Sequence, residues 1–188
     1  NKPLIYWSIT KSLNSKKVNQ TWVSSDSKKI LDYSIKCGAS IIRRPKKFAK
    51  DKSSSESAWI HGINYIKKKG FNSENIIGIQ PTSPIRSSKD FDEAIKVFEI
   101  NKLDSLFTST KVNDFFIWKK NKKGKFIANY NYKSRKTRQE IDDKYLENGS
   151  FFIFKTKKFL KFKCRLFGKI GTYVMPKTKS YQIDEKED

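Results

Sequence analysis

Polar side chains follow a short hydrophobic stretch near the middle of the chain. Residues 76–79 (Ile-Ile-Gly-Ile) are uncharged and mostly β-branched, which is typical of a buried strand. Pro81 ends this strand, because proline has no N–H group to give to a sheet, and Gln80 is left at its carboxyl end. The turn over residues 80–86 (QPTSPIR) then carries hydroxyls and one guanidinium. Open α/β sheets bind ligands beside the carboxyl ends of their strands, so this turn is a candidate wall of a ligand site.

A helix is predicted directly after this turn. Phe91, Ala94, Ile95 and Phe98 recur at helical spacing and give the segment one apolar face. Ser88 precedes the acidic pair at residues 92–93 near the predicted start, which suits a helix N-terminus. Strand, polar turn and helix therefore follow one another in the order that builds a ligand crevice.

The residues that most often act as nucleophiles or metal ligands do not cluster in this sequence. His61, the sole histidine, falls inside a predicted helix without a partner at catalytic spacing, so we expect a structural role. Cys37 and Cys164 form no Cys-x-x-Cys pair, which argues against a disulfide framework and a zinc site. The sequence thus contains no Ser–His or Cys–His constellation of the kind that nucleophilic enzymes use.

Strands and helices alternate over residues 18–111, which predicts an α/β fold. Strands are expected at Val18–Val23, Ala39–Arg43 and Asp104–Val112, and helices at Leu4–Leu13, from residue 27 to Lys36, and at Glu56–Lys69. Before the second of these helices, we expect Asp26 to be an N-cap rather than a metal ligand.

Composition limits the classes of protein to which the chain can belong. With 188 residues, 36% of them hydrophobic, it is long enough for one folded domain. The net charge of +22 favours anionic small molecules, but the lysines are dispersed and no basic recognition helix appears, so a nucleic-acid binder is not expected. No apolar run approaches the roughly 20 residues of a membrane-spanning helix, and no signal peptide opens the sequence. We expect no membrane attachment and a cytoplasmic location.

Six stretches in uninterrupted order resemble the CMP-N-acylneuraminate cytidylyltransferases, which activate sialic acids and related nonulosonic acids. They are residues 2–5 (KPLI), 24–26 (SSD), 44–55 (RPKKFAKDKSSS), 80–86 (QPTSPIR), 145–154 (YLENGSFFIF) and 168–176 (GKIGTYVMP). The resemblance spans essentially the whole chain. It implies a nucleotidyltransferase that joins CTP to a sugar acid and releases pyrophosphate.

The resemblance assigns the stretch over residues 44–55 to the cytosine of CTP. By position it implicates Arg44, Ser53 and Ser55. Hydroxyls and free N–H groups at a helix start can match the hydrogen-bonding edge of cytosine and exclude other bases. Helix capping alone would explain one of the serines.

The resemblance places five residues on the sugar side: Gln80, Arg138, Gln139, Asn148 and Phe152. An arginine can grip a sugar carboxylate with two hydrogen bonds, and amide side chains can hold hydroxyls. The residues alone equally fit a turn at Asn148 and a strand of the core at Phe152. Leu146 stands where the family usually has a second arginine, and Phe152 where it often has tyrosine. We therefore expect a different sugar acid, or weaker binding of the sugar acid.

The end of the chain carries the expected metal site. In the family, two aspartates one residue apart lie on the same side of an extended segment and hold Mg²⁺. Residues 180–184 (SYQID) match this ending with Gln182 at the first position and Asp184 at the second. Asp184 is therefore the expected catalytic metal ligand, and Gln182 a weaker neutral one. The same stretch, together with residues 168–176, is expected to form two short strands.

The resemblance also implies the architecture. It predicts a three-layer, Rossmann-like α/β fold of the nucleotide-diphospho-sugar-transferase type, with a mixed sheet and helices on both faces. Residues 1–188 would be one domain, with a dimerisation extension at 112–147 built around a hairpin at residues 122–124. Aromatic side chains on this hairpin would need a partner surface, which a homodimer supplies. The family's phosphate-binding loop precedes the match to residues 2–5, so the domain is expected to be incomplete at its N-terminus.

Two alternatives to this assignment remain. A CMP-Kdo synthetase shares the fold and the chemistry, although residues 80–86 and 147–149 resemble it less. A non-catalytic paralogue that binds sugar or nucleotide without turnover would account for Gln182 and for the absent loop. Arg86 is expected to be structural.

Overall fold

Helices and strands alternate along the computed structural model, which describes residues 2–50, 52–112, 116–140, 142–185 and 187–188, with Arg138 described by its backbone alone. The helices are α1 (Leu4–Leu13), α2 (Lys28–Lys36), α3 (Ser55–Lys68), α4 (Ser88–Ile100) and α5 (Thr156–Phe162), with short 3₁₀ turns η1 (Lys46–Phe48), η2 (Arg138–Glu140) and η3 (Lys177–Lys179). The strands are β1 (Trp22–Ser25), β2 (Ser40–Arg43), β3 (Asn75–Ile79), β4 (Ser105–Val112), β5 (Trp118–Lys120), β6 (Phe126–Ala128), β7 (Lys144–Lys155) and β8 (Ile170–Val174).

Serine side chains begin the helices that follow β1, η1 and β3. Ser27 is the N-cap of α2 and accepts a hydrogen bond from the N–H of Ile30, so the predicted N-cap at Asp26 was wrong by one residue. Ser54 caps α3 in the same way. At α4, Ser87 forms a capping box with Asp90. Each cap satisfies N–H groups that a helix start leaves without an intrahelical partner.

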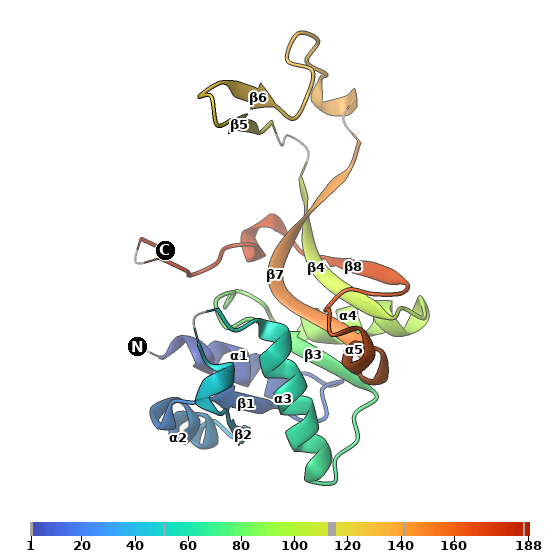
Figure 1. Cartoon of the computed structure of the whole chain (residues 1–188). Coiled ribbons are helices and arrows are strands. Elements are labelled where there is room, and N and C mark those ends of the chain that lie inside the picture. The colour runs from blue at the N-terminus through green and yellow to red at the C-terminus, as the bar shows by residue number, and fades with distance from the viewer. Residues whose placement is uncertain (1, 51, 113–115, 141, 186) are drawn as a thin grey trace.

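The central sheet is mixed, as predicted. It has four strands in the order β3-β7-β4-β8, in which β7 is antiparallel to β3 and β4, and β8 is parallel to β4. A second, two-stranded parallel sheet consists of β1 and β2. The strands of the expected α/β fold are therefore present but divided between two sheets (Figure 1).

Helices cover both faces of β7, because its buried side chains alternate between two hydrophobic clusters. Phe151 and Ile153 pack with the apolar face of α4. Phe152 and Phe154 point to the opposite face and pack with residues of α3 and α5. This period of two places a layer of helix on each side of the strand, which confirms the predicted layering.

The predicted hairpin stands apart from the body of the molecule. Strands β5 and β6 pair antiparallel on either side of residues 121–125, and the long ends of β4 and β7 carry them away from the sheet (Figure 1). Trp118 is 45% exposed and Phe126 is 60% exposed. The hairpin thus presents aromatic side chains to solvent.

The C-terminal segment differs from the prediction. Residues 170–174 form β8, but residues 180–184 form no strand, because η3 turns the chain after Pro176. A single backbone hydrogen bond, from the N–H of Ile183 to the carbonyl of Thr82 (2.8 Å), holds the segment against the turn over residues 80–86.

The glycine of β3 offers a test of this packing. A Cβ atom at Gly78 would lie 2.6 Å from Cζ2 of Trp59, so Gly78→Ala forces the indole out of its place. We expect a loss of about 1–3 kcal/mol in the free energy of unfolding, measured by urea denaturation.

Gly62→Ala is the matched control. A Cβ atom there would lie 3.6 Å from Ile42, an ordinary contact, within the helix α3. Its free energy of unfolding should stay equal or rise by roughly 0.5–1 kcal/mol. Equal stability of wild type and Gly78→Ala would contradict the packing described.

Candidate functional site

A groove of about 880 Å³ runs between the two sheets, bounded by β1 on one side and β3 on the other. Its polar end is lined by Arg44, Ser55 and Gln80, three of the residues that the family resemblance assigns to substrate binding. They follow β2, begin α3 and follow β3, respectively. The carboxyl ends of strands and a helix N-terminus therefore converge here, as open α/β sheets require.

Gln80 lies at the carboxyl end of β3, where the sequence predicts it. Its side-chain N–H donates a hydrogen bond to the hydroxyl of Ser55 (3.3 Å), the first residue of α3. Ser53 lies one turn earlier, where its hydroxyl accepts from the N–H of Lys50 (3.1 Å). Ser53 thus holds the loop, while Ser55 and Gln80 face each other across the end of the groove.

Arg44 has a donor without a partner. Its Nε is buried and forms no hydrogen bond with any residue that the structure describes. Burial, together with the charges of Arg44 and Lys47, lowers the pKa of the neighbouring His61, so this histidine favours the neutral form. An unpaired buried N–H is costly, and a ligand acceptor at the groove end would satisfy it.

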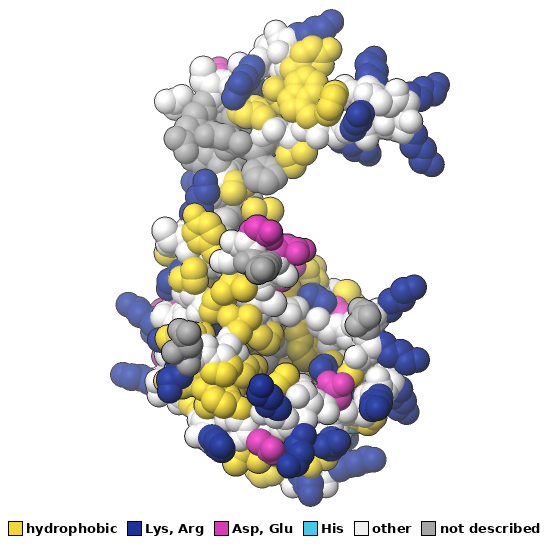
Figure 2. Space-filling model, turned by 90° about the vertical axis from the view of Figure 1, so that its left-hand side faces the viewer, with side chains coloured by type: hydrophobic (Ala, Val, Ile, Leu, Met, Phe, Trp, Pro, Cys, Tyr) yellow, Lys and Arg dark blue, Asp and Glu magenta, His cyan; other side chains and the backbone are white. Residues whose placement is uncertain are grey.

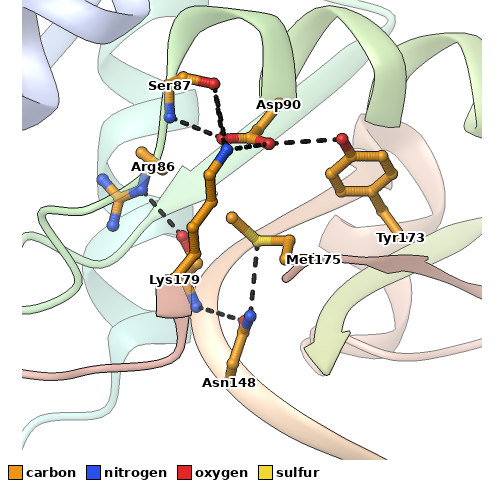
Figure 3. A network of polar contacts seen from close by, with 8 residues as sticks. Arg86, Ser87, Asp90, Asn148, Tyr173, Met175 and Lys179 are labelled. Atoms are coloured by element: carbon orange, nitrogen blue, oxygen red, sulfur yellow. Dashed lines mark hydrogen bonds and ion pairs between the residues drawn. The ribbon is translucent and has the colours of Figure 1, made fainter. Parts of the chain in front are cut away.

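The buried side chain of Arg86 holds the turn over residues 80–86 in place (Figure 3). It is 2% exposed, and its guanidinium donates to the hydroxyls of Ser150 (2.9 Å) and Ser8 (3.0 Å) and to the carbonyl of Gln80. Burial lowers the pKa of Arg86 to about 10, against the opposing charge of Asp90. The arginine remains charged near neutral pH and joins α1, the end of β3 and β7.

Asn148 is turned into the protein. It is 2% exposed, its side-chain N–H lies 3.4 Å from the sulfur of Met175, and its side-chain oxygen accepts from the N–H of Ser150 (3.2 Å). The following Gly149 has φ +64°, a conformation that favours glycine. Both residues lie within β7, at a shift in its register with β4, rather than in a turn, and the amide is used internally.

Phe152 belongs to the core. It is 1% exposed and lies 6.0 Å from the ring of Trp59, with the guanidinium of Arg165 4.8 Å from its own ring. The side chain has no surface for a sugar in this structure, which matches the strand-core interpretation.

Arg138 and Gln139 lie in η2, within the part of the chain that stands away from the sheets (Figure 1). Gln139 is exposed. The structure does not bring these two residues to the groove of their own chain.

Gln182 and Asp184 follow η3. The side-chain N–H of Gln182 donates to the carbonyl of Asn148 (2.8 Å), so its amide fastens the C-terminal segment to β7. Asp184 is exposed, and its backbone N–H donates to Asp188. Within the described ranges, no group of three His, Cys, Asp or Glu side chains is placed to hold a metal ion.

A second buried interaction, between Asp90 and Lys179, was not predicted from the sequence. The ammonium lies 2.7 Å from Oδ2 of Asp90, and the hydroxyl of Tyr173 lies 3.3 Å from Oδ1 (Figure 3). Burial and the Asp90 charge raise the pKa of Tyr173 to about 12, so it stays protonated. The capping position of Asp90 was a recognisable signal, but its distant partner was not.

Comparison with known proteins decides the family. A family model described as Cytidylyltransferase matches residues 1–188. The chain belongs to the cytidylyltransferase family. Its expected membership is thus confirmed over the whole sequence.

Two named relatives of this cytidylyltransferase differ in length. N-acylneuraminate cytidylyltransferase A of Danio rerio is 30% identical over 186 residues, which cover 97% of this chain and 42% of the relative. Pseudaminic acid cytidylyltransferase of Campylobacter jejuni is 25% identical over 192 residues, which cover 100% of this chain and 82% of the relative. The chain therefore spans less than half of the fish protein.

Solved structures show the same fold at low identity. The cytidylyltransferase chain matches 4-diphosphocytidyl-2C-methyl-D-erythritol synthase from Anaerococcus prevotii with a TM-score of 0.68 and 12% identity, over 99% of this chain and 82% of that one. It matches a CMP:2-keto-3-deoxy-manno-octonic acid synthetase complexed with CTP with a TM-score of 0.61 and 11% identity, over 94% and 80%. The mixed α/β fold of the family is thus confirmed.

The Asp90–Lys179 pair predicts a pH-dependent stability for this cytidylyltransferase. Burial alone would raise the pKa of Asp90, but hydrogen bonds from Lys179 and Ser87 outweigh it and hold the pKa below its ordinary value. The stabilisation is therefore complete above the unfolded pKa of about 3.9 and is lost as pH falls through the folded value. Asp90→Asn should cost roughly 1.5–3 kcal/mol at pH 7 in urea denaturation.

The difference in stability between wild type and Asp90→Asn should shrink towards zero in acid. Asp26→Asn is the control, because Asp26 is exposed, and it should unfold like the wild type at every pH. A pH-independent difference in the free energy of unfolding between wild type and Asp90→Asn would show that the stabilisation does not depend on the charge of Asp90.

Proposed function

We propose that this chain transfers CMP from CTP to the anomeric hydroxyl of a sialic-acid-like nonulosonic acid. The observation that carries the proposal is the convergence of Arg44, Ser55 and Gln80 at the polar end of one groove, in a chain matched throughout by the cytidylyltransferase model. The sugar class follows from the names of the relatives, which act on N-acylneuraminate and pseudaminic acid.

The base is assigned to the Arg44 side of the groove end. The unpaired Nε of Arg44 can donate to a carbonyl oxygen of cytosine. The Ser55 hydroxyl and the N–H groups at the start of α3 can pair with the rest of the base edge. A site built from such groups rejects a base that leaves them unpaired.

The reaction needs positioning rather than a protein nucleophile. The sugar's anomeric oxygen forms a bond to the α-phosphorus as the bond to pyrophosphate breaks, and the hydroxyl proton passes to solvent or a base. Gln80, at the end of β3, lies where it can orient the sugar. The dispersed lysines seen over the surface (Figure 2) favour approach of two anionic substrates.

Magnesium is part of the proposal. Asp184 is exposed on the segment that lies against the turn over residues 80–86, and a single carboxylate suffices for Mg²⁺ when substrate phosphates and water supply the other ligands. Gln182 uses its N–H on Asn148, which leaves its oxygen as a weak neutral ligand. When bound, the ion would neutralise charge on the triphosphate.

A homodimer and a cytoplasmic location complete the proposal. Among the described residues, no helix is long and apolar enough to cross a bilayer. The aromatic surface of the β5–β6 hairpin favours a second copy as its partner. A second copy would also give Arg138 and Gln139 a groove to face.

Two rival functions have weaker support. The likeness to the CMP:2-keto-3-deoxy-manno-octonic acid synthetase is one of fold at 11% identity, whereas the sequence relatives carry the nonulosonic names. A protein that binds the same ligands without turnover would keep the polar residues at the groove end. Only the pyrophosphate-release assay described below would distinguish it from an enzyme.

Nucleotide binding tests the base assignment. We expect CTP to bind more tightly than UTP in calorimetric titration with Mg²⁺, and Arg44→Ala to weaken CTP binding by about tenfold or more, because a hydrogen bond from a charged donor is lost. Arg43→Ala is the control, since Arg43 is the exposed neighbour, and it should bind CTP like the wild type.

Pyrophosphate release from CTP with N-acetylneuraminate or pseudaminic acid then separates enzyme from binding protein. Turnover that Arg44→Ala lowers and Arg43→Ala keeps is the expected result. Selective CTP binding without turnover on either sugar would favour the binding protein, and equal binding of CTP and UTP would overturn the base assignment.

Sedimentation tests the dimer. We expect the wild type to sediment as a dimer, and Trp118→Ser with Phe126→Ser to shift it to the monomer, because both side chains would lose their partner surface. Lys122→Ser, in the hairpin turn, should leave the dimer intact. A monomeric wild type would contradict this part of the proposal.

A further inference from the structure

One edge of β1 has no partner strand. The carbonyls of Thr21 and Ser25 accept hydrogen bonds from residues 40 and 44 on the β2 side. In a strand, backbone groups alternate between the two edges, so Trp22 and Ser24 direct their N–H and C=O groups to the opposite side. No strand in the described part of the chain pairs with that edge.

One edge of β3 is open in the same way. The carbonyl of Glu74 and the N–H of Gln80 bond to β7, at Thr156 and Ser150. By the same alternation, Ile77 and Ile79 direct their backbone groups away from β7. Strand β3 is the outermost of its sheet, and β7 is its one neighbour among the described strands.

These two open edges face the same groove. Trp22, Val23 and Ser24 line one side of it, and Ile77 and Ile79 line the other. The floor and roof are largely apolar and come from α1, α3 and α4, including Ile9, Ile63 and Phe98. The hydroxyl of Ser24 is buried there without a hydrogen-bond partner in the described structure.

Strands β1 and β3 also run in the same direction along the groove. At one end, Gln80 follows β3 and lies with Arg44, which follows β2, the parallel partner of β1. At the other end, Trp22, which begins β1, contacts Phe71, just ahead of β3, with ring centroids 5.8 Å apart. The groove is therefore a strand-shaped gap with equivalent ends on both sides.

We propose that this groove binds an extended peptide segment, which enters as a strand and pairs with β1 and β3 at once. Backbone N–H and C=O groups away from water need partners, and a strand supplies a matching row to each edge. Both faces of the inserted segment would be covered by helices, so its four or five residues must be apolar on both faces. The inserted strand would join the two sheets into one.

This inference is independent of the nucleotide and the sugar. It concerns the apolar length of the groove, whereas the proposed substrates occupy the polar end at Arg44, Ser55 and Gln80. A compact apolar ligand would fill the volume but would leave the row of backbone groups unpaired.

Residue-resolved amide exchange with a synthetic peptide tests the proposal. The probe has five alternating valine and isoleucine residues between two pairs of lysines, which oppose nonspecific attraction to the basic chain. At saturation it should slow exchange at the amides of Trp22, Ser24, Ile77 and Ile79 by at least about tenfold. The same peptide with N-methyl groups at alternate residues, which cannot donate to an edge, should have no effect.

A pair of variants checks the edge from the protein side. Ser24→Pro removes an N–H that faces the groove and keeps the bonds to β2, so it should abolish protection by the peptide; Ser24→Ala keeps the N–H and should retain it. Circular dichroism confirms that both variants fold.

Three results would overturn the proposal. One is equal protection by the N-methylated peptide. Another is no protection in the folded wild type at millimolar peptide. The third is slow exchange at these amides before any peptide is added, whether the two edges close on each other or on a second copy, the latter revealed by dependence on protein concentration.

Discussion

A single buried charge organises the candidate site. Arg86 lies inside the protein, where its hydrogen-bond partners among the described residues are two hydroxyls and a carbonyl, and burying a guanidinium is costly unless its donors are satisfied. That requirement fixes the turn over residues 80–86 relative to Ser8 in α1 and Ser150 in β7. Gln80 is consequently held at the end of β3, beside Ser55 and at the mouth of the groove.

The C-terminal segment depends on the same turn. Lys179 pairs with Asp90 just after the turn, the N–H of Ile183 donates to Thr82 within it, and Gln182 donates to the carbonyl of Asn148 in β7. Segments that are about a hundred residues apart in the chain therefore meet at one short turn. The proposed base, sugar and metal positions come from different elements, and their relative placement is set by these few polar contacts.

Local patterns predicted much of the fold. Helix α1 matches its predicted range, and the β5–β6 hairpin and the succession of β3, turn and α4 follow from periodicity and turn residues alone. Helix α5 has seven residues, too few for a periodic signal, and the irregular course of residues 180–184 depends on distant hydrogen bonds. Arg44, Ser55 and Gln80 could be assigned to one site from the family resemblance, whereas the inward orientation of Asn148 and the separate position of Gln139 depend on tertiary packing that no local pattern encodes.

The role of Arg86 is tested most directly by amide exchange of Ser83, whose N–H donates to the carbonyl of Gln80 (3.3 Å), in wild type and in Arg86→Lys. Lysine keeps the charge but cannot reach three partners in the planar geometry of arginine. The account predicts that Ser83 exchanges at least about tenfold faster in the variant relative to Ile153 in the core of β7. An unchanged ratio of the two rates would show that the turn holds its shape without the guanidinium, and would contradict the central claim.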